Sequence, residues 1–342
     1  MNGVFIERAG PMMTVQDLGR AGNIALGLSR GGAMDRCAIL EATALLGARH
    51  VLPGIEMAGI GGVFRAEGRV RFSLTGAPMM AQIDGAEIAW NAAHRMESGQ
   101  RLTIGGLRSG SYGYLTFAGG MIGDHWRGSQ SAHLTAGIGK LLLSGDFISL
   151  RDDPIPDFPM QRMDIPDRFS GGLLRLMPGP QTALFDAQTR ARMACTSFQR
   201  HAQSNRQGIR LVADAPFATD AAQLLSDAIL CGDVQMTGTG LPYILMAECQ
   251  TIGGYPRIGT VIAQDIPRAS QAPAGAELQF KWLTVEEADR LFQSDALILA
   301  QLRKMLRPMR RDPAQIANLL AYQLISGMTC GDELEDANDT DN

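Results

Sequence analysis

Three polar segments that contain glycine hold most of the side chains able to do chemistry in this chain of 342 residues. They read TVQDLGRAGNIALGLSRGGAMD (14–35), SNRQGIRL (204–211) and MAECQTIGGYPRIGTVIAQDIPRASQ (246–271). An arginine can hold a carboxylate or a phosphate through two hydrogen bonds. Arg20 in the first segment is therefore a candidate anion ligand, or else an ion-pair partner of Asp17 or Asp35 that fixes the loop.

The second segment places Arg206 close after Ser204 and on the same strand face as Arg210. One of these arginines would point into a cleft and the other would form a structural pair. We expect Arg206 to be the exposed, functional one, so that its removal reduces activity more than folding.

The third segment contains an amide, a phenol and a carboxylate. The amide of Gln250 both donates and accepts hydrogen bonds, which suits a urea or a lactam, and Tyr255 could donate to a developing oxyanion. Gly253 and Gly254 permit a sharp turn before Tyr255, which is also a sensible structural corner. Asp265, followed by Gln271, would either hold Mg²⁺ near ATP phosphates or cap a helix.

The glycines of the first segment have two interpretations. They bring backbone N–H groups close to an anion, or they are turn residues that pack against the protein's own core. Cys249 has no evident histidine partner, and we expect it to be a buried, unreactive thiol.

Composition and missing motifs restrict the function. Hydrophobic residues make up 45 % of the chain, charged residues 19 %, and the net charge is −4, which argues against a nucleic-acid surface. The sequence has no Walker A motif, no zinc-ligand spacing and no G-x-S-x-G turn. None of its lysines, Lys140, Lys281 and Lys304, lies in the setting of a biotinylated carrier. No signal peptide or membrane span is predicted, and the five cysteines without a C-x-x-C pair indicate a cytoplasmic protein.

Short apolar runs separated by glycine predict a mainly β protein with added helices, in which barrel-like closure is favoured. We expect an N-terminal β lobe over 1–150, an exposed proline-rich connector over 151–169 and a second β lobe over 170–283. Strands are expected at 69–77, 101–106, 112–120 and 140–150, and a helix at 33–48. C-terminal helices within 284–330 are expected at 284–306, opened by a capping box, and at 312–327. The acidic tail 331–342 is predicted to be disordered.

The same segments carry a resemblance to a known family. The sequence resembles the carboxyltransferase-domain proteins called allophanate hydrolase subunit 2, or urea amidolyase-related protein, which include the C subunit of 5-oxoprolinase. The family pattern reads roughly T-V-Q-D-L-G-R-x-G, G-V-P-x-S-G-A-M-D, S-x-R-x-G-x-R-L and D-x-Q-T-x-G-G-Y-P, and the resemblance covers about Gly3 to Trp282. Three departures stand out: Leu28-Ser29-Arg30-Gly31-Gly32 replaces Val-Pro-x-Ser-Gly, Glu248 replaces the aspartate before Gln-Thr, and Ala274-Gly275 replaces Pro-Gly.

The resemblance implies a cyclophilin-like β-barrel architecture and a homologous partner, the B subunit, with an A subunit also present in the complex. It implies ATP-dependent activation of a small lactam or urea-like substrate, with ATP and Mg²⁺ as cofactors of the complex and no covalent biotin on this chain. Arg20, Arg206, Gln250 and Tyr255 would be catalytic. The substrate- or nucleotide-binding residues would be Asp17, Asp35, Ser204, Gly253, Gly254, Asp265 and Gln271, with no bound metal of the chain's own.

Two other functions stay open on this evidence. One is a regulatory binding protein without turnover, which docks on a B-like partner. The other is a biotin-dependent, urea-type carboxyltransferase component, which would receive biotin on another chain. In each case we expect neither nucleic acid nor membrane as a partner.

Overall fold

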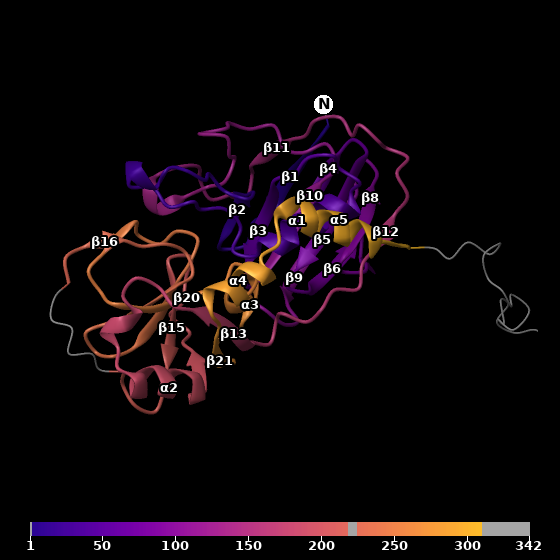
Figure 1. Ribbon diagram of the computed structural model, residues 1–342. Coiled ribbons are helices and arrows are strands. Elements are labelled where there is room, and N and C mark those ends of the chain that lie inside the picture. The colour runs from indigo at the N-terminus through magenta and orange to yellow at the C-terminus, as the bar shows by residue number, and fades with distance from the viewer. Residues whose placement is uncertain (1, 218–223, 310–342) are drawn as a thin grey trace, which may run out of the picture.

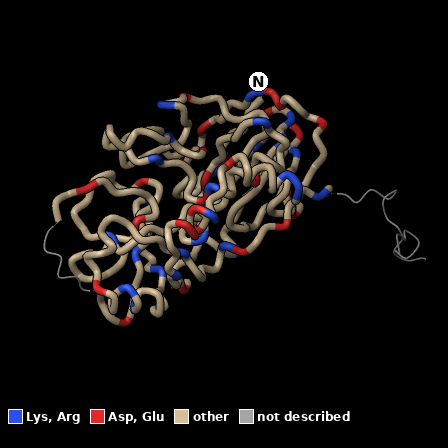
Figure 2. The backbone as a smooth tube through the Cα atoms, in the orientation of Figure 1, with Lys and Arg blue, Asp and Glu red and all other residues tan. Residues whose placement is uncertain are grey.

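A computed structural model describes residues 2–217 and 224–309 (Figure 1). The N-terminal part is built from two β-sheets, and the C-terminal part from a closed β-barrel. Basic and acidic residues are interspersed along both parts (Figure 2). The mainly β architecture with barrel closure that we expect from the sequence is confirmed.

The two N-terminal sheets pack face to face around a shared apolar core. One sheet has the strand order β11-β1-β4-β9-β6-β7, and the other β2-β3-β10-β5-β8-β12-β22. Buried side chains of both sheets, such as Phe64 and Phe72, meet between them. The strands are β1 (Gly3–Arg8), β2 (Met13–Gln16), β3 (Gly54–Ala58), β4 (Val63–Glu67), β5 (Val70–Gly76), β6 (Met79–Ile83), β7 (Ala86–Glu87), β8 (Ala92–Met96), β9 (Arg101–Leu107), β10 (Tyr112–Phe117), β11 (Phe147–Ser149), β12 (Gln161–Arg162) and β22 (Arg307–Pro308).

Seven strands close the C-terminal barrel in the order β13-β20-β17-β18-β15-β14-β21. The closing pair, β13 and β21, is parallel, whereas the other pairs of the barrel are antiparallel. A separate two-stranded ribbon, β16 and β19, lies beside it. The strands are β13 (Gly172–Met177), β14 (Phe198–Arg200), β15 (Gly208–Val212), β16 (Asp227–Ala228), β17 (Asp233–Met236), β18 (Pro242–Leu245), β19 (Ile252–Gly253), β20 (Arg257–Val261) and β21 (Glu277–Trp282).

One apolar core joins the two parts. It runs from the barrel interior, which includes Phe198 and Phe280, to Met34, Ile39 and Tyr114 of the N-terminal part. Burying such side chains contributes roughly 1.5–3 kcal/mol each. The two parts are therefore held together by hydrophobic packing as well as by the polar contacts described below.

The helices are short and lie around the sheets. They are α1 (Arg36–Leu45), α2 (Ala187–Cys195), α3 (Ile266–Gln271), α4 (Val285–Leu291) and α5 (Asp295–Lys304), with 3₁₀ turns η1 (Ile24–Leu26), η2 (Leu134–Ala136) and η3 (Thr182–Leu184). Helix α1 begins directly after Asp35, whose carboxylate accepts a hydrogen bond from the Ala38 N–H at 3.2 Å. This is the usual way to satisfy a free N–H group at a helix start.

The prediction of a single helix over 284–306 is wrong, because this segment forms two helices, α4 and α5. The predicted capping box is present at Thr284 and Glu287. A second cap interrupts the helix, since Ser294 accepts a hydrogen bond from the Leu297 N–H at 3.3 Å. The pair then crosses from the barrel to α1 of the N-terminal part (Figure 1).

Two further expectations need correction. The strand predicted over 140–150 forms only at Phe147–Ser149, because the chain turns at Gly145 (φ +94°). The segment 151–169 is not simply an exposed connector, since it contains strand β12 and the buried residues Met163, Arg168 and Phe169. The helix predicted at 312–327 and the tail predicted at 331–342 lie outside the described residues.

Candidate active site

A pocket on the outer surface of the barrel brings together two of the predicted catalytic residues, Gln250 and Tyr255. Its volume is about 300 Å³, which is within the size range of small-molecule sites. Strands β15, β17 and β18 form its floor, because their alternate side chains Ile209, Val234 and Ile244 point into the barrel core and leave the others facing outward. We call it the amide pocket, after its lining side chains Gln203, Asn205, Gln207, Gln235 and Gln250.

Each predicted residue of the third segment has a definite place here. Tyr255 is 52 % exposed at the rim of the amide pocket. Gly253 lies in β19, and a Cβ atom at this position would come within 2.8 Å of Gln235 Nε2. The glycine thus leaves room for that amide, while Gly254 continues the turn to Tyr255. Ser204 is held beside the pocket by a 2.7 Å hydrogen bond to the His201 carbonyl.

The amide lining is what sequence reasoning missed. Gln203, Asn205 and Gln207 surround the two predicted residues Ser204 and Arg206. The density of amides in QSNRQG is the signal that points to them. Gln235 gives no such signal, because it lies in the β17–β18 hairpin and comes beside the amides of QSNRQG only when β15 pairs with β18.

The Cys249 thiol lies between the amide pocket and the buried part of the protein. It is 4 % exposed, and burial raises its pKa to about 12. A thiol with such a pKa stays protonated at neutral pH and is a poor nucleophile. This agrees with the expectation of a buried, unreactive cysteine.

Arg206 is not the exposed arginine that we expected. It is 9 % exposed and precedes β15, so it does not share a strand face with Arg210. Its Nε donates to Glu248 at 2.6 Å, its Nη1 pairs with Glu56 and its Nη2 donates to the Gly32 carbonyl at 2.7 Å. All three nitrogens are thus used within the protein, which favours a structural role at the junction of the two parts.

The polar contacts of Arg206 extend through Glu56 into the N-terminal part. Glu56 accepts hydrogen bonds from the Tyr114 hydroxyl at 2.6 Å and from the Met34 N–H at 2.8 Å. The same hydroxyl accepts from the Asp35 N–H at 2.8 Å. Burial and the Glu56 carboxylate raise the pKa of Tyr114 well above its usual value, so this phenol remains a donor.

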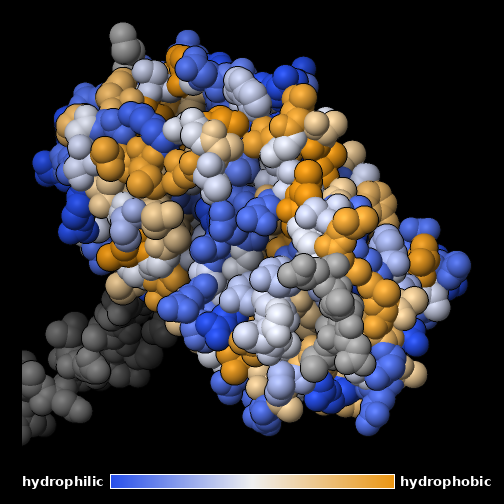
Figure 3. Space-filling model, turned by 90° about the vertical axis from the view of Figure 1, so that its left-hand side faces the viewer, coloured by the Kyte–Doolittle hydropathy of each residue, from blue (hydrophilic) through white to orange (hydrophobic). Residues whose placement is uncertain are grey.

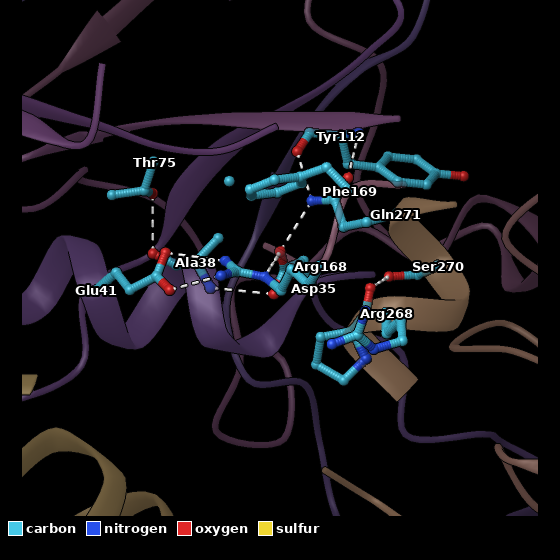
Figure 4. A network of polar contacts seen from close by, with 12 residues as sticks. Asp35, Ala38, Glu41, Thr75, Tyr112, Arg168, Phe169, Arg268, Ser270 and Gln271 are labelled. Carbon is cyan, nitrogen blue, oxygen red and sulfur yellow. Dashed lines mark hydrogen bonds and ion pairs between the residues drawn. The ribbon is translucent and has the colours of Figure 1, made fainter. Parts of the chain in front are cut away.

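Asp35 and Gln271 belong to a second polar cluster, which joins the lobes through Arg168 (Figure 4). Asp35 accepts from Arg168 Nε at 2.7 Å and from Gln271 Nε2 at 2.8 Å. Arg168 also holds Glu41 with two hydrogen bonds of 2.8 and 2.9 Å. Burial alone would lower the pKa of Arg168, but Asp35 and Glu41 raise it well above its usual value. These contacts favour structural roles for Asp35 and Gln271, away from the amide pocket.

Asp17 and Arg20 organise the first polar segment against the loop 126–131. The Asp17 carboxylate accepts from the Ser129 hydroxyl at 2.6 Å and from the Gln130 N–H at 2.8 Å. Arg20 is 2 % exposed, donates to the Ser131 carbonyl and lies over the Trp126 ring, with 5.6 Å to the ring centre. Within the described part of the chain, Arg20 makes no ion pair with Asp17 or Asp35. Burial lowers the pKa of Arg20.

The glycines of the first segment pack mainly against the protein itself. Gly19 and Gly32 have φ angles of +75° and +87°. A Cβ atom would come within 2.6 Å of the Arg30 carbonyl at Gly19, and within 2.6 Å of the Gly19 nitrogen at Gly32. Two loop segments of the backbone are thus in contact at a point where no side chain would fit. This favours turn and packing roles for these two positions over anion binding.

The carboxylate of Asp265 is paired with an arginine, Arg175. Asp265 lies at the start of α3, but its side chain makes no capping hydrogen bond. Its two oxygens instead accept from Arg175 at 2.8 and 2.6 Å. Over residues 2–217 and 224–309, no three His, Cys, Asp or Glu side chains converge as a metal site. The residues present therefore do not fit a magnesium ion held by this chain at Asp265.

Comparisons with known proteins agree with the resemblance found in the sequence. The sequence model described as carboxyltransferase domain, subdomain A and B, matches residues 26–282. The chain belongs to this carboxyltransferase-domain family. None of the helices in the described ranges is long and apolar enough to cross a membrane.

Relatives of two kinds are similar to this member of the family. A protein named as the C subunit of 5-oxoprolinase from Escherichia coli is 34 % identical over 308 residues, which is 87 % of this chain and 96 % of the relative. A protein of the same name from Haemophilus influenzae is 30 % identical over 86 % of this chain and 95 % of the relative. The crystal structure of Kluyveromyces lactis urea carboxylase shares the fold, with a TM-score of 0.80 at 21 % identity, covering 91 % of this chain and 31 % of that chain.

Proposed function

We propose that this chain is the C subunit of an ATP-dependent complex of the 5-oxoprolinase type, which acts on a small lactam or amide together with a homologous B subunit. The observation that carries the proposal is the similarity to two proteins named as the C subunit of 5-oxoprolinase, along 96 % and 95 % of their lengths. That name supports a hydrolase assembled from this chain with A and B subunits.

The amide pocket supports this choice of substrate. A lactam presents one N–H donor and one carbonyl acceptor, and each glutamine or asparagine side chain offers both complementary groups. Gln250 and Gln235 both line a pocket of about 300 Å³, with Tyr255 at its rim. A phenol at this position can donate to the carbonyl oxygen as negative charge develops on it.

The surface beside the pocket supports the presence of a partner. Large apolar side chains on neighbouring loops are exposed, among them Leu26 and Ile252 at 61 % each, Leu225 at 93 % and Trp126 at 43 %. Figure 3 shows hydrophobic patches on the side of the molecule that carries the η1 and β16 loops. Exposed apolar patches of this kind are typical of protein–protein interfaces. We propose that the B subunit covers them.

ATP and Mg²⁺ belong to the proposed complex and not to this chain alone. Because Asp265 is paired with Arg175, we derive no step of the reaction through a metal-bound nucleotide on this chain. The chain's own contribution is to bind and orient the amide and to stabilise charge on its oxygen.

The test is reconstitution. The chain is co-expressed with the homologous A and B subunits of the same genome, and ATP hydrolysis and ring opening of 5-oxoproline are measured together. We expect both only when all three proteins are present. Gln250→Ala should reduce turnover about two- to tenfold, because a lost hydrogen bond between neutral groups costs roughly 0.5–1.5 kcal/mol. The control, Gln279→Ala, changes an exposed residue of β21 and should be neutral.

A second candidate function is a component of a urea-type carboxyltransferase. It is supported by a relative named putative urea carboxylase from Emericella nidulans, 26 % identical over 83 % of this chain. In the reconstitution experiment, carboxyl transfer from carboxybiotin to urea without 5-oxoproline turnover would replace the first proposal by this one. Tight binding to the B subunit without any turnover would indicate a regulatory protein instead.

A further inference from the structure

Three side chains from distant segments lie in a row, and the first of them, Ser29, belongs to the loop that joins η1 to α1. The hydroxyl of Ser29 lies 2.8 Å from His133 Nε2. On the other side of the ring, His133 Nδ1 lies 3.8 Å from Glu248 Oε2. All three residues are nearly enclosed, with exposed fractions of 9 % for Ser29, 4 % for His133 and 4 % for Glu248. Hydroxyl, imidazole and carboxylate thus follow one another in the order used for nucleophilic catalysis. The 3.8 Å separation is longer than a hydrogen bond, and His133 Nδ1 has no hydrogen-bond partner within the described residues.

A cationic donor completes the set. Arg20 Nη1 is buried and has no hydrogen-bond partner in the described part of the chain. A Cβ atom at Gly31 would come within 3.3 Å of the His133 ring and 3.4 Å of Arg20 Nη1, so both groups border the same small space. A buried donor without a partner costs about 1–3 kcal/mol or more, unless something binds to it. An oxyanion formed at Ser29 would provide such a partner.

The set also coincides with departures from the family pattern. Ser29 stands where the pattern has proline, and Glu248 stands where it has aspartate. Two of the three members are thus residues in which this chain differs from the pattern quoted above. The serine hydroxyl is therefore new relative to the quoted pattern, whereas the carboxylate is kept as the longer glutamate.

We propose that Ser29, His133 and Glu248 act as nucleophile, base and positioning carboxylate, and that this chain alone hydrolyses small activated acyl esters without ATP. The catalytic residues are Ser29 and His133, and Arg20 stabilises the oxyanion. This activity goes beyond the proposed role in a complex, and it needs neither the A subunit nor the B subunit.

The reaction has two balanced halves. In the first, Ser29 Oγ bonds to the acyl carbon while its proton moves to His133 Nε2; the ester C–O bond breaks, and the leaving alcohol takes that proton. In the second, water gives a proton to His133 Nε2 and its oxygen bonds to the acyl carbon. The C–Oγ bond then breaks and Oγ regains the proton, which leaves a carboxylic acid and the free serine.

The protonation state of His133 suits a base. Burial lowers its pKa, Glu248 acts in the opposite direction, and Arg20 and Arg206 lower it further. The ring is therefore neutral at pH 7 and able to accept a proton.

The test uses the full-length chain alone, with p-nitrophenyl acetate as substrate and diisopropyl fluorophosphate as the label. We expect hydrolysis above the blank and a single label on the peptide that contains Ser29. Ser29→Ala and His133→Asn should each reduce the rate at least about 100-fold, with the fold checked by circular dichroism. Ser98→Ala and His94→Asn are matched controls remote from the set, and His94 is buried in a similar way; both should retain the rate.

The role of Glu248 has its own readout. Glu248→Gln removes the charge that raises the pKa of His133. The acid limb of the pH–rate profile should therefore move to lower pH, a shift that merely structural damage would not produce. The proposal is overturned if the wild-type chain does not exceed the blank, if folded Ser29→Ala keeps the wild-type rate, or if the label is absent from Ser29. None of these outcomes bears on ATP-dependent turnover by the reconstituted complex, so the two proposals fail separately.

Discussion

At the scale of single residues, the burial of Arg206 changes what its removal should do. Arg206→Ala leaves Glu56 and Glu248 buried without their cation. Breaking a buried pair in this way costs about 3–5 kcal/mol. We therefore expect a much lower free energy of unfolding in a urea titration, and loss of activity only as a consequence.

The matched control for this prediction is Arg69→Ala. Arg69 is paired with Glu97 at the surface, with side chains 54 % and 64 % exposed. Exposed pairs contribute about 0–1 kcal/mol. Similar unfolding curves for both variants would show that Arg206 is not a structural residue.

His133 should make stability depend on pH. Its pKa is lowered in the folded protein from the reference value of 6.5, because burial disfavours the charged ring. The unfolded chain therefore binds a proton first as the pH falls. The contribution of neutral His133 is fully present above the unfolded pKa and is lost as the pH decreases below about 6.5.

The measurement compares the wild-type chain with His133→Asn by urea unfolding at several pH values between about 5 and 8. The stability difference in favour of the wild type should increase with pH and become constant above about pH 7. A difference that is the same at every pH would contradict the shift.

At the scale of elements, α5 attaches the end of the described chain to α1. Leu299 and Leu302 pack with Leu40, Ala44 and Leu45. Leu299→Ala should cost about 2–3 kcal/mol, since Leu299 is 9 % exposed and its truncation leaves a cavity. Leu297→Ala, on the same helix but 48 % exposed, should change the midpoint of thermal unfolding very little. Equal shifts for the two variants would show that α5 does not cover a core.

The elements were predictable where the signal is local. The Thr284–Glu287 capping box and strands β5, β9 and β10 each depend on a few neighbouring residues. The break between α4 and α5 was missed because the apolar spacing continues through the Ser294 cap. Arg168 was assigned to an exposed connector because its partners, Asp35 and Glu41, lie more than a hundred positions away.

The candidate site shows the same limit. Gln250 and Tyr255 can be proposed from the sequence because they lie in one segment with recognisable chemistry, and the structure brings them to one pocket. Gln235 and the contact between Ser29 and His133 depend on tertiary packing, and the histidine itself carried no spacing signal. Burial also reversed the interpretation of Arg206, since a sequence does not show which arginines are enclosed.

At the scale of the whole molecule, the exposed apolar loops give the proposed partnership a direct test. Leu26→Asp and Ile252→Asp each place a charge on a side chain that is 61 % exposed. We expect weaker association with the B subunit, by at least about tenfold in Kd, with an unchanged melting temperature. Association is measured by biolayer interferometry with the B subunit immobilised.

The control for the loop variants is Leu173→Asp, on β13 and 48 % exposed. It should leave the affinity unchanged. If all three variants bind the B subunit as the wild-type chain does, the partner contacts another surface.

The buried ion pairs of Arg168 and Arg206 also limit when the protein can fold as it is synthesised. The N-terminal part contributes the buried acids Asp35, Glu41 and Glu56, whereas their cations, Arg168 and Arg206, come later in the chain. The parallel partner of β13 is β21, so the barrel cannot close until residue 282 has been added. While the chain is still growing on the ribosome, the first half has three carboxylates that must stay hydrated or bind protons. A nascent chain that stops before Arg168 therefore lacks the cations that its buried acids need. The native fold is reached only near the end of translation.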